Sequence, residues 1–390
     1  MSLKISILTS SDFPYGMAME SFVRQLSFGL HSNNVNLEVI RLYGNRFNNV
    51  NDTEIKCSNY LFNKPFQYEL FKVFEIMFQV LFIPIFIFYR KILKKDDAIL
   101  MYGLDRSYFV FPFTIFSKLL KLKTFRIITE IYSEHTYVTN LLRKPLVFFN
   151  ESQIKYFDKY LDGIVVLSNF LKEMELKSGV KDNRILLIPH FIRFDTKPSG
   201  EFDKNNILKF RIGFCGNPTL ENGIIDLIDA FSLLRAKRLN QVELIIIGEI
   251  NPVVLKEIAN RSLENIIFTG KLSSKDVLIE LEKCSVLVNP RRISISADSG
   301  FPTKIGEYFA AKKTVIATMV GDLCFYFKDK RELIFAEANN PLSIYSAIDY
   351  AFENPHVAFE IAKRGNQWAI QNLDYKNNSK KLIEFIKESL

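Results

Sequence analysis

A lysine and a glutamate, Lys304 and Glu307, lie three positions apart in the stretch SGFPTKIGEYFAAKKTVIAT, residues 299–318. A Gly-Phe-Pro break precedes the pair, and a β-branched run typical of a buried strand follows it. On a helix this spacing puts both side chains on one face. One interpretation is a surface ion pair, which would contribute only about a few tenths of a kcal/mol. The other is a clamp in which the lysine binds a diphosphate and the glutamate binds a ribose.

Two arginines, Arg291 and Arg292, directly follow the apolar run SVLVNP at residues 285–290. The carboxyl ends of parallel strands meet at one edge of a sheet, and ligands bind beyond that edge. We therefore expect this pair to lie at the same edge as Lys304 and Glu307.

Several common signatures of catalytic sites are absent from the sequence. It contains no GxGxxG, Walker phosphate loop, HExxH or GxSxG. No DxD-type pair of carboxylates lies in a suitable loop, because Asp96 and Asp97 precede a predicted strand and Asp105 stands alone. We therefore expect no metal and no other cofactor.

Cysteine usage indicates the compartment. Cys57, Cys215, Cys284 and Cys324 are far apart and form no CxxC pair, so neither disulfides nor a zinc site are expected. The N-terminal run KISILTS is too short for the core of a signal peptide. A reducing, cytoplasmic setting fits these features.

The chain is long and basic. Its 390 residues exceed the usual size of a single core, so two domains are expected. Residues 1–190 carry 24 Lys and Arg against 18 Asp and Glu, which is most of the net charge of +8. An anionic partner such as a lipid surface or a phosphorylated substrate suits this half. No recognisable nucleic-acid motif accompanies the charge, so nucleic acid ranks last.

Short apolar runs alternate with helix-length stretches in both halves, which is typical of parallel sheets covered on both faces. The runs lie at residues 4–10, 37–43, 98–103, 125–131, 163–168, 185–190, 210–216, 242–248, 265–270, 285–290 and 314–318. This pattern predicts an α/β chain of two Rossmann-like, doubly wound domains that face each other across a cleft. We place the first domain at 1–192, a polar linker at 193–208 and the second domain at 209–372. The C-terminal helix at 373–390 could cross back to the first domain.

A strongly apolar segment, residues 76–89, has no charge and is followed by the basic run RKILKK. It is shorter than the roughly 20 residues that span a bilayer. Two interpretations remain open. The segment is either a deeply buried helix or a monotopic anchor whose basic residues lie on lipid head groups.

Four stretches of the second half resemble the donor-binding half of retaining glycosyltransferases of family four, which are group 1 glycosyltransferases with the GT-B fold. They are GFCGNPTLENGIIDLIDAFSLL, VELIIIGE, IIFTGKLSSKDVLIELEKCSVLVNPRR and GFPTKIGEYFAAKKTVIAT. The first half is similar to the family less specifically, through YGMAMESFVRQLSFGL, LDGIVVLSNFLKEM and ILLIPHFI. The resemblance implies transfer of a sugar from a nucleotide diphosphate donor, with retention at the anomeric carbon.

The resemblance also assigns roles to the cations. A departing diphosphate develops negative charge, which fixed cations and backbone donors can stabilise. By similarity to the family, Glu307 binds the ribose and Lys304 binds the diphosphate. In a subgroup of the family an Asn-Pro-Arg after the corresponding strand accompanies a Pro-x-Lys before the helix, which implies that Arg291 acts beside Lys304, with Arg292 as a donor-binding neighbour.

Further donor-binding positions follow from the same resemblance. Backbone groups of Lys271 and Leu272 are expected to hold the base, and Gly16 in the loop after the first strand lets backbone approach the donor phosphate closely. Gly321 is the last of the expected donor-binding residues.

Four positions depart from the commoner family pattern, one of which is Lys312 in place of a glycine near the helix end. Asn217 and Asn222 replace a basic pair, and Ser299 replaces the first of two glutamates that bind donor hydroxyls. Asn217 and Ser299 nevertheless remain candidate donor contacts.

On the acceptor side, the stretch TEIYSEHTY lies where family members carry an acidic residue or a histidine near the reacting carbon. Glu134 and His135 are therefore catalytic candidates, together with Lys304 and Arg291, and Glu130 is an acceptor-side candidate. A single Glu or His at such a position is more often structural than catalytic.

These features predict a glycosyltransferase on the cytoplasmic face of the membrane that acts on a saccharide, expected to be lipid-linked, in cell-surface polysaccharide or glycan synthesis. A UDP-sugar is favoured over a GDP-sugar as donor. Two alternatives remain. One is another GT-B enzyme, such as a nucleotide-sugar epimerase, and the other is a degenerate, non-catalytic scaffold partner of other glycosyltransferases.

Overall fold

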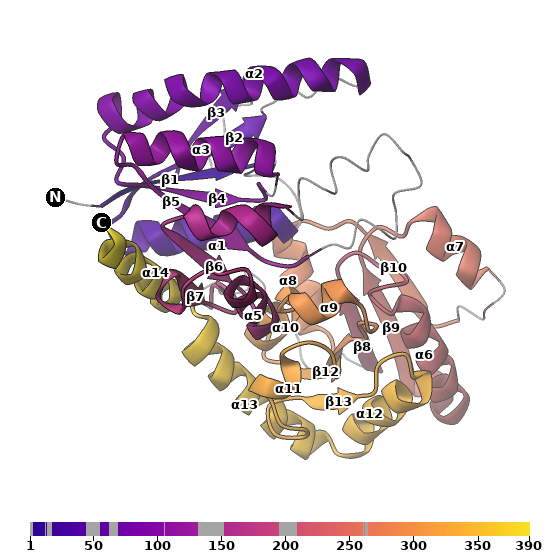
Figure 1. The fold of residues 1–390 in the computed structure, drawn as a ribbon. Helices are drawn as coiled ribbons and strands as arrows, with labels where there is room; N and C mark the ends of the chain where they lie inside the picture. The colour runs from indigo at the N-terminus through magenta and orange to yellow at the C-terminus, as the bar shows by residue number, and fades with distance from the viewer. Residues whose placement is uncertain are drawn as a thin grey trace. The chain divides into compact units, whose positions relative to one another are not determined.

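The computed structural model describes most of the chain. The described residues are 3–11, 13, 18–43, 55–61, 69–104, 106–131, 152–194, 209–259, 261 and 264–390. The chain divides into two compact units (Figure 1). Unit 1 comprises Met1–Phe191 and Tyr375–Leu390, and unit 2 comprises Ile192–Asp374. The C-terminal helix α14 (Tyr375–Ser389) therefore belongs to the N-terminal unit.

Unit 1 is built on a parallel sheet whose order, in the described part of the chain, is β3-β2-β1-β4-β5-β6-β7. The strands are β1 (Lys4–Thr9), β2 (Asn36–Tyr43), β3 (Lys56–Leu61), β4 (Ala98–Tyr102), β5 (Lys123–Ile128), β6 (Gly163–Val166) and β7 (Ile185–Leu187). The six apolar runs that the sequence shows in this half of the chain coincide with β1, β2, β4, β5, β6 and β7. β3 was not predicted, because KCSNYL lacks a continuous apolar run.

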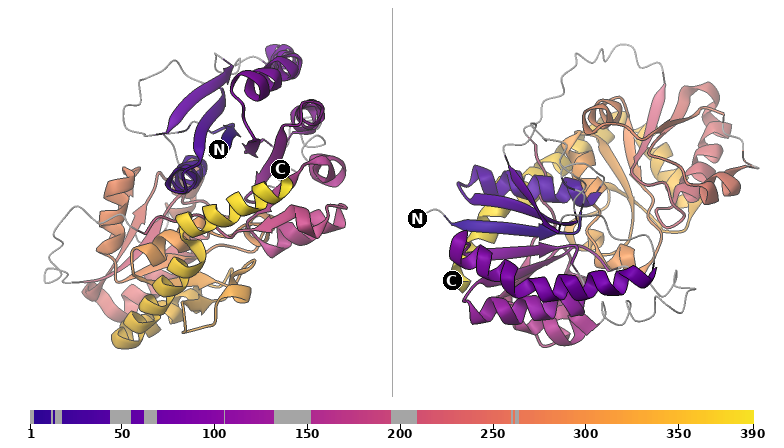
Figure 2. Two further views of the ribbon diagram at one scale, coloured as in Figure 1. Left: turned by 90° about the vertical axis from the view of Figure 1, so that its left-hand side faces the viewer. Right: turned by 90° about the horizontal axis from the view of Figure 1, so that it is seen from above.

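Helices cover both faces of this sheet. They are α1 (Ala18–Ser32), α2 (Glu69–Phe88), which continues into the wider turn η1 (Tyr89–Leu93), α3 (Ser107–Leu119), the short turns η4 (Gln153–Phe157) and η5 (Asp158–Tyr160), and α5 (Asn169–Lys177). Helices α2, α3 and α5 pack into one apolar core with alternate strand residues such as Met101 and Ile128. Helix α14 covers the other face, where the rings of Phe125 and Phe385 lie 5.8 Å apart, and it packs along α1 (Figure 2).

Helix α2 presents apolar side chains on two faces. Ile83, Phe86 and Ile87 are buried in the core of unit 1. Leu81 and Ile85, on the opposite side, are 71% and 62% exposed. One helix thus supplies a core face and an outward apolar face, so the interpretation as a deeply buried helix is wrong for its outer face, and the membrane anchor stays a prediction. Among the described residues, no helix is long and apolar enough to cross a membrane.

The basic run after α2 does not lie wholly at the surface. Arg90 is 2% exposed, and its guanidinium donates to Asp96 and to Glu38, at 2.7 Å in each case. These carboxylates raise the pKa of Arg90 against the opposing effect of burial. Arg90 therefore connects β2 to the residues that precede β4. The expectation that Arg90 lies on lipid head groups is wrong.

Unit 2 is built on a second parallel sheet, with the order β10-β9-β8-β11-β12-β13. Its strands are β8 (Phe210–Cys215), β9 (Val242–Ile247), β10 (Ile266–Gly270), β11 (Val286–Asn289), β12 (Thr314–Thr318) and β13 (Ile334–Ala336). Its helices are α6 (Ile224–Arg238), α7 (Pro252–Ile258), α8 (Ser274–Glu282), α9 (Ile295–Ser299), α10 (Thr303–Ala310), α11 (Leu323–Tyr326), α12 (Pro341–Glu353) and α13 (Pro355–Leu373). Two Rossmann-like parallel sheets confirm the predicted fold class.

The strand order of unit 2 reverses between β8 and β11. In doubly wound sheets, ligands bind beyond the carboxyl ends of the two strands between which the order reverses. The residues that follow β8 and β11, and those at the start of α10, are therefore the first place to look for a site.

Candidate functional site

Two glycines form the floor of this site at the ends of β8 and β9. Gly216 follows β8 with φ +121°, and its N–H donates to the carbonyl of Ile247 at 2.9 Å. A Cβ on Gly248, at φ +150°, would lie 2.1 Å from the carbonyl oxygen of Gly216. The N–H of Gly248 in turn donates to the carbonyl of Gly270 at 3.0 Å, at the end of β10. The ends of three strands are thus joined closely, which only residues without side chains allow.

Lys304, in the first turn of α10, lies across the end of β8. Its Nζ is 4.4 Å from the centroid of the Phe214 ring, and a Cβ on Gly216 would lie 2.4 Å from its Cε. The side chain is half-buried. This placement is unlike that of a solvated surface lysine, and it brings a cation to the switch point of the sheet.

Glu307 follows one turn later on α10 and is also half-buried. Burial raises the pKa of its carboxyl, and the positive charge of Lys304 opposes that rise. The two side chains are therefore coupled electrostatically at the end of β8. Their predicted position at the carboxyl edge of the sheet agrees with the structure, whereas their roles stay a prediction.

Tyr308, which sequence reasoning did not single out, fixes α10 to the sheet. Its ring is fully buried, and its Oη accepts a hydrogen bond from the Cys215 N–H at 2.8 Å. The same hydroxyl lies 3.5 Å from the carbonyl oxygen of Val288 in β11. Burial raises the pKa of Tyr308 well above its usual value, so the hydroxyl stays protonated. The only sequence signal was its position next to Glu307.

The two arginines after β11 have different partners. Arg291 donates from Nη2 to the Ser296 hydroxyl at 2.7 Å, and its carbonyl accepts from Thr318 Oγ1 at 2.5 Å. Arg292 makes a bidentate ion pair with Asp226 of α6, at 2.7 and 2.6 Å. This pair joins the β11 loop to α6, which is a structural role that the sequence did not indicate. A donor contact by Arg292 stays a prediction.

Ser299 and Gly321 belong to a second, tightly packed turn. Ser299 is fully buried, and its hydroxyl donates to the Ser296 carbonyl at 3.4 Å. Gly321 has φ +54°, and its N–H donates to Asp298 Oδ1 at 3.1 Å. A Cβ there would lie 2.6 Å from the carbonyl oxygen of Ala297. The turn after β12 therefore holds the end of α9 in place.

The remaining donor-side candidates lie around the same sheet edge. Asn217 is exposed directly after Gly216, and its carbonyl accepts from Asn222 Nδ2 at 2.8 Å. Lys271 is exposed and Leu272 half-buried, immediately after β10. The structure therefore brings Lys304, Glu307, Arg291, Arg292, Asn217, Lys271, Leu272, Ser299 and Gly321 to the carboxyl-end side of one sheet.

The acceptor-side candidates belong to unit 1. Glu130 is half-buried just after β5. Gly16, Glu134 and His135 lie outside the described residues. In the part of the chain that the structure describes, no group of three or more His, Cys, Asp or Glu side chains could hold a metal ion. Independence from metal stays a prediction.

Comparison with known proteins identifies relatives of this arrangement. Residues 209–354 match the family model described as "Glycosyl transferases group 1". An uncharacterized glycosyltransferase of Methanocaldococcus jannaschii is 26% identical over 228 residues, which cover 57% of this chain. The alignment spans 60% of the length of that relative.

Solved structures match the whole chain. Anabaena HepE, crystallised with UDP and glucose, has a TM-score of 0.70 at 15% identity, covering 99% of this chain and 100% of that one. A glycosyltransferase from Rickettsia africae has a TM-score of 0.72 at 17% identity, covering 100% of this chain and 98% of that one. TarM has a TM-score of 0.70 at 14% identity, covering 99% of each chain. The chain therefore has the GT-B fold of these proteins, and the match of its C-terminal unit to the group 1 family supports a glycosyltransferase.

Proposed function

We propose that this protein transfers a sugar from a nucleotide diphosphate sugar to a lipid-linked saccharide, with retention of anomeric configuration. The observation that carries the proposal is Lys304, which lies across the end of β8 against Gly216 and Phe214, with Glu307 one turn away. This is a cation and a carboxylate at the position where doubly wound sheets bind nucleotides.

The proposed reaction makes specific demands on these residues. When the anomeric carbon–oxygen bond breaks, negative charge develops on the diphosphate, and the ammonium of Lys304 would stabilise it. Because Lys304 lies in the first turn of α10, the positive end of the helix dipole acts in the same direction. Arg291, at the end of β11, would supply a second cation.

Glu307 has a different task in this proposal. Its carboxylate would accept hydrogen bonds from the two ribose hydroxyls, which take no part in the bond changes. The raised pKa of Glu307 is consistent with a group kept from water until a ligand supplies donors. Tyr308, which contacts β8 and β11, would hold α10 so that Glu307 and Lys304 stay at the ends of both strands.

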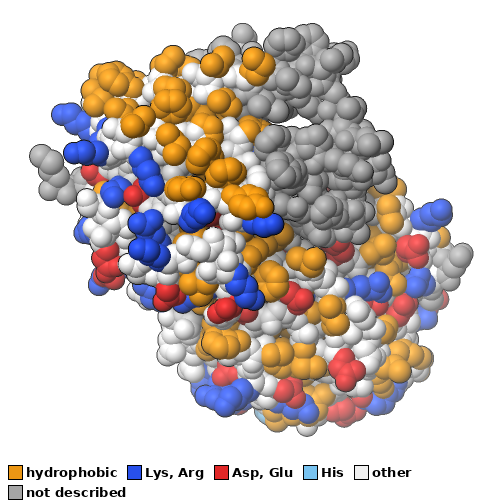
Figure 3. Space-filling view, viewed as in Figure 1, with side chains coloured by type: hydrophobic (Ala, Val, Ile, Leu, Met, Phe, Trp, Pro, Cys, Tyr) orange, Lys and Arg blue, Asp and Glu red, His pale blue; other side chains and the backbone are white. Residues whose placement is uncertain are grey.

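The donor is proposed to be a UDP-sugar in preference to a GDP-sugar, with no metal required. The UDP complexes of Anabaena HepE, whose fold this chain shares, support that choice. We place the enzyme at the cytoplasmic face of the membrane, in the synthesis of cell-surface glycans. The exposed apolar side chains of α2 support this location (Figure 3).

Two alternatives make different predictions. An epimerase acting on nucleotide sugars would turn over its donor without any acceptor. A non-catalytic scaffold, suggested by Asn217, Asn222 and Ser299 at positions of the commoner motif, would bind nucleotide weakly or not at all.

A thermal-shift panel with UDP, GDP, ADP and CMP, each with and without EDTA, tests the proposal. A nucleotide at 100 times its dissociation constant stabilises by about 2.7 kcal/mol. We expect UDP to raise the melting temperature most, equally in EDTA, and Lys304→Ala to reduce that shift while Lys256→Ala, an exposed lysine of α7, leaves it unchanged. NMR of the anomeric proton of the product then establishes retention. No shift with any nucleotide would favour the scaffold, and a strict metal requirement would overturn the donor-site proposal.

A further inference from the structure

Unit 1 carries a continuous apolar surface on the outer faces of α2, η1 and the end of α3, which we call the apolar ridge. Its exposed side chains recur every three or four residues along the helix, so they share one face. They are Met77, Leu81, Ile85, Phe88, Ile92 and Leu93, joined by Leu119 of α3, which is 72% exposed. Figure 3 shows these hydrophobic side chains gathered over α2 and α3, with Lys and Arg side chains beside them.

Two lysines and a tyrosine lie close to one another at the end of α3 and in η5, beside Leu119 in the sequence of α3. The rings of Phe111 in α3 and Phe157 in η4 lie 4.4 Å apart, which joins the two elements. Lys118 and Lys159 hold their ammonium groups 5.7 and 5.6 Å from the Tyr160 ring. Amphipathic aromatic rings and lysines with long apolar stems suit the boundary between hydrocarbon and head groups.

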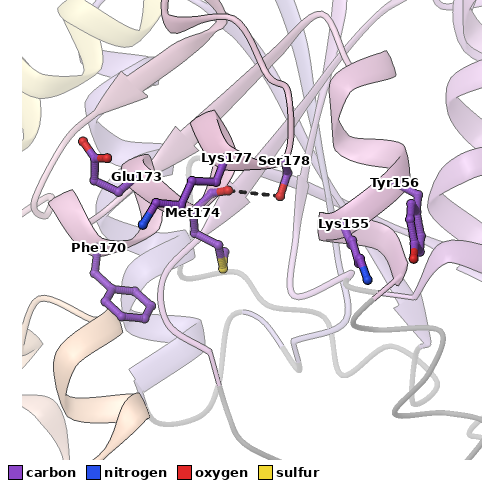
Figure 4. A pocket seen from close by; sticks show the side chains of 7 residues that line it. All are labelled: Lys155, Tyr156, Phe170, Glu173, Met174, Lys177 and Ser178. Atoms are coloured by element: carbon purple, nitrogen blue, oxygen red, sulfur yellow. Dashed lines mark hydrogen bonds between the residues drawn. The ribbon is translucent and has the colours of Figure 1, made fainter.

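A hollow of about 580 Å³ lies between η4 and α5 (Figure 4). It is lined by Lys155, Tyr156, Phe170, Glu173, Met174, Lys177 and Ser178. Lys155 and Lys177 outnumber the single carboxylate of Glu173, so the lining carries a net positive charge. Lys155 lies 5.1 Å from the Tyr156 ring, and Tyr156 and Phe170 are 46% and 42% exposed.

We propose that this hollow binds the phosphate of an anionic bilayer lipid while the apolar ridge enters the edge of the bilayer. Lys155 and Lys177 lie on opposite sides of the hollow (Figure 4), and the positive charge of either one complements a phosphodiester. The exposed rings and Met174 supply apolar surface for the glycerol and the first carbons of the chains. The η4 turn supplies Lys155 and Tyr156 to the hollow and packs on α3, which contributes Leu119 to the ridge, so the two features lie on neighbouring elements of one unit. The inference rests on the proposed membrane association and deepens it by naming a lipid site.

Binding to vesicles is the first test. We expect the full chain to bind vesicles of phosphatidylglycerol and not vesicles of phosphatidylcholine. High salt should abolish the binding to phosphatidylglycerol. Lys155→Gln/Lys177→Gln should weaken partitioning by about tenfold or more, since each basic residue near the surface contributes about 1 kcal/mol. The matched control Lys256→Gln/Lys380→Gln removes the same charge from two exposed lysines and should bind like wild type.

A second measurement separates a lipid site from general attraction. Methyl NMR of labelled methionines, with dihexanoylphosphatidylglycerol below its micelle concentration, should show a saturable shift of the Met174 signal. Met101, buried in β4, should not shift. Met174→Leu assigns the signal.

The outcomes decide the inference and leave the proposed transferase activity separately testable. Equal loss of vesicle binding in the hollow variant and the control, or an unmoved Met174 signal, would overturn the lipid site. UDP stabilisation and transfer to a water-soluble acceptor should be unchanged in Lys155→Gln/Lys177→Gln. If UDP does not raise the melting temperature of the wild-type protein, that result counts against the proposed function and not against the lipid site.

Discussion

The two units share a backbone plan but use their charges differently. In each sheet the first strand of the unit lies in the interior and the order reverses beside it, between β1 and β4 in unit 1 and between β8 and β11 in unit 2. At the switch point of unit 2, a half-buried lysine and glutamate lie against the strand ends. At that of unit 1, the Ser10 hydroxyl donates to the Gly103 carbonyl at 2.7 Å.

Two groups of ion pairs in unit 1 are buried and lie away from its switch point. Arg90 joins Glu38 and Asp96, and Arg126 pairs with Asp158 beneath α5. These charges cannot meet a ligand, because their partners already surround them in the core. Other lysines of unit 1 remain at the surface, among them Lys118, which directly precedes Leu119 of the apolar ridge. A net charge counted from the sequence therefore overstates the charge that a partner can reach. The same scaffold presents half-buried charges at the strand ends of unit 2 and an exposed apolar surface on α2 of unit 1.

The largest effect is expected from a substitution that disrupts packing at the switch point of unit 2. A Cβ on Gly223, at φ +70°, would lie 1.8 Å from the carbonyl oxygen of Pro290. Gly179 in unit 1 has φ +88° but no atom within 4 Å of a Cβ position. We expect Gly179→Ala to lower the free energy of unfolding by about 1–2 kcal/mol, the cost of the left-handed backbone, and Gly223→Ala to lower it by several kcal/mol more. Urea unfolding measures both, and equal losses would show that backbone strain alone matters.

The second effect concerns catalysis by unit 2. Lys304→Ala should lower kcat by about 10²-fold, or about 2.7 kcal/mol, because the ammonium acts mainly as the diphosphate departs. Glu307→Gln keeps the shape of the side chain and weakens contacts to a ribose that does not react, so it should mainly raise the KM for donor. Steady-state kinetics at saturating donor distinguishes them. Near-normal turnover in Lys304→Ala would return this lysine to a structural role.

The third effect separates the two arginines after β11. Arg292→Ala leaves the buried carboxylate of Asp226 without its bidentate partner, and we expect a loss of about 1–2 kcal/mol in unfolding free energy, since the guanidinium is partly exposed. Arg291→Ala should instead lower kcat, as Lys304→Ala does. Combined denaturation and kinetic measurements check the pair, and a catalytic loss in Arg292→Ala without any loss of stability would reverse this assignment.

The smallest effect concerns pH and sharpens the account of unit 1. Burial and the neighbouring charge of Asp158 raise the pKa of Glu175 to about 9, so the folded protein holds a proton that the unfolded chain releases near pH 4.5. Between pH 4.5 and about pH 9, unfolding therefore releases this proton, so the free energy of unfolding falls as pH rises. From pH 7 to 8, Glu175→Gln should remove a decline of up to about 1.4 kcal/mol.

The matched control for this measurement is Glu173→Gln, an exposed carboxylate on the same helix. Its pH dependence of unfolding should match that of wild type. His190 contributes with the opposite sign at lower pH, because burial lowers its pKa to about 4 and stability then rises as pH increases toward 6.5. An unchanged slope in Glu175→Gln would show that Glu175 is ionised in the folded protein.

The sequence by itself determined the sheet-forming runs and the fold class. Continuous apolar runs such as AILMYG and SVLVNP indicate strands of a parallel sheet covered on both faces, and every residue of β4 and β11 is buried. Lys304, Glu307 and the arginines were placed at one sheet edge by the same argument, since residues after parallel strands meet there. Short strands without such a run, β3 and β13 (Ile334–Ala336), escaped it.

Which of those polar residues are available to a ligand depends on packing between distant segments. Arg292 pairs with Asp226, 66 positions earlier, and Arg90 with Glu38, 52 positions earlier. The two faces of α2 and the anchoring of Tyr308 to β8 likewise depend on elements distant in the sequence. Periodicity and local motifs report on neighbours within a few residues, whereas burial and charge pairing are set by whichever distant segments pack against them.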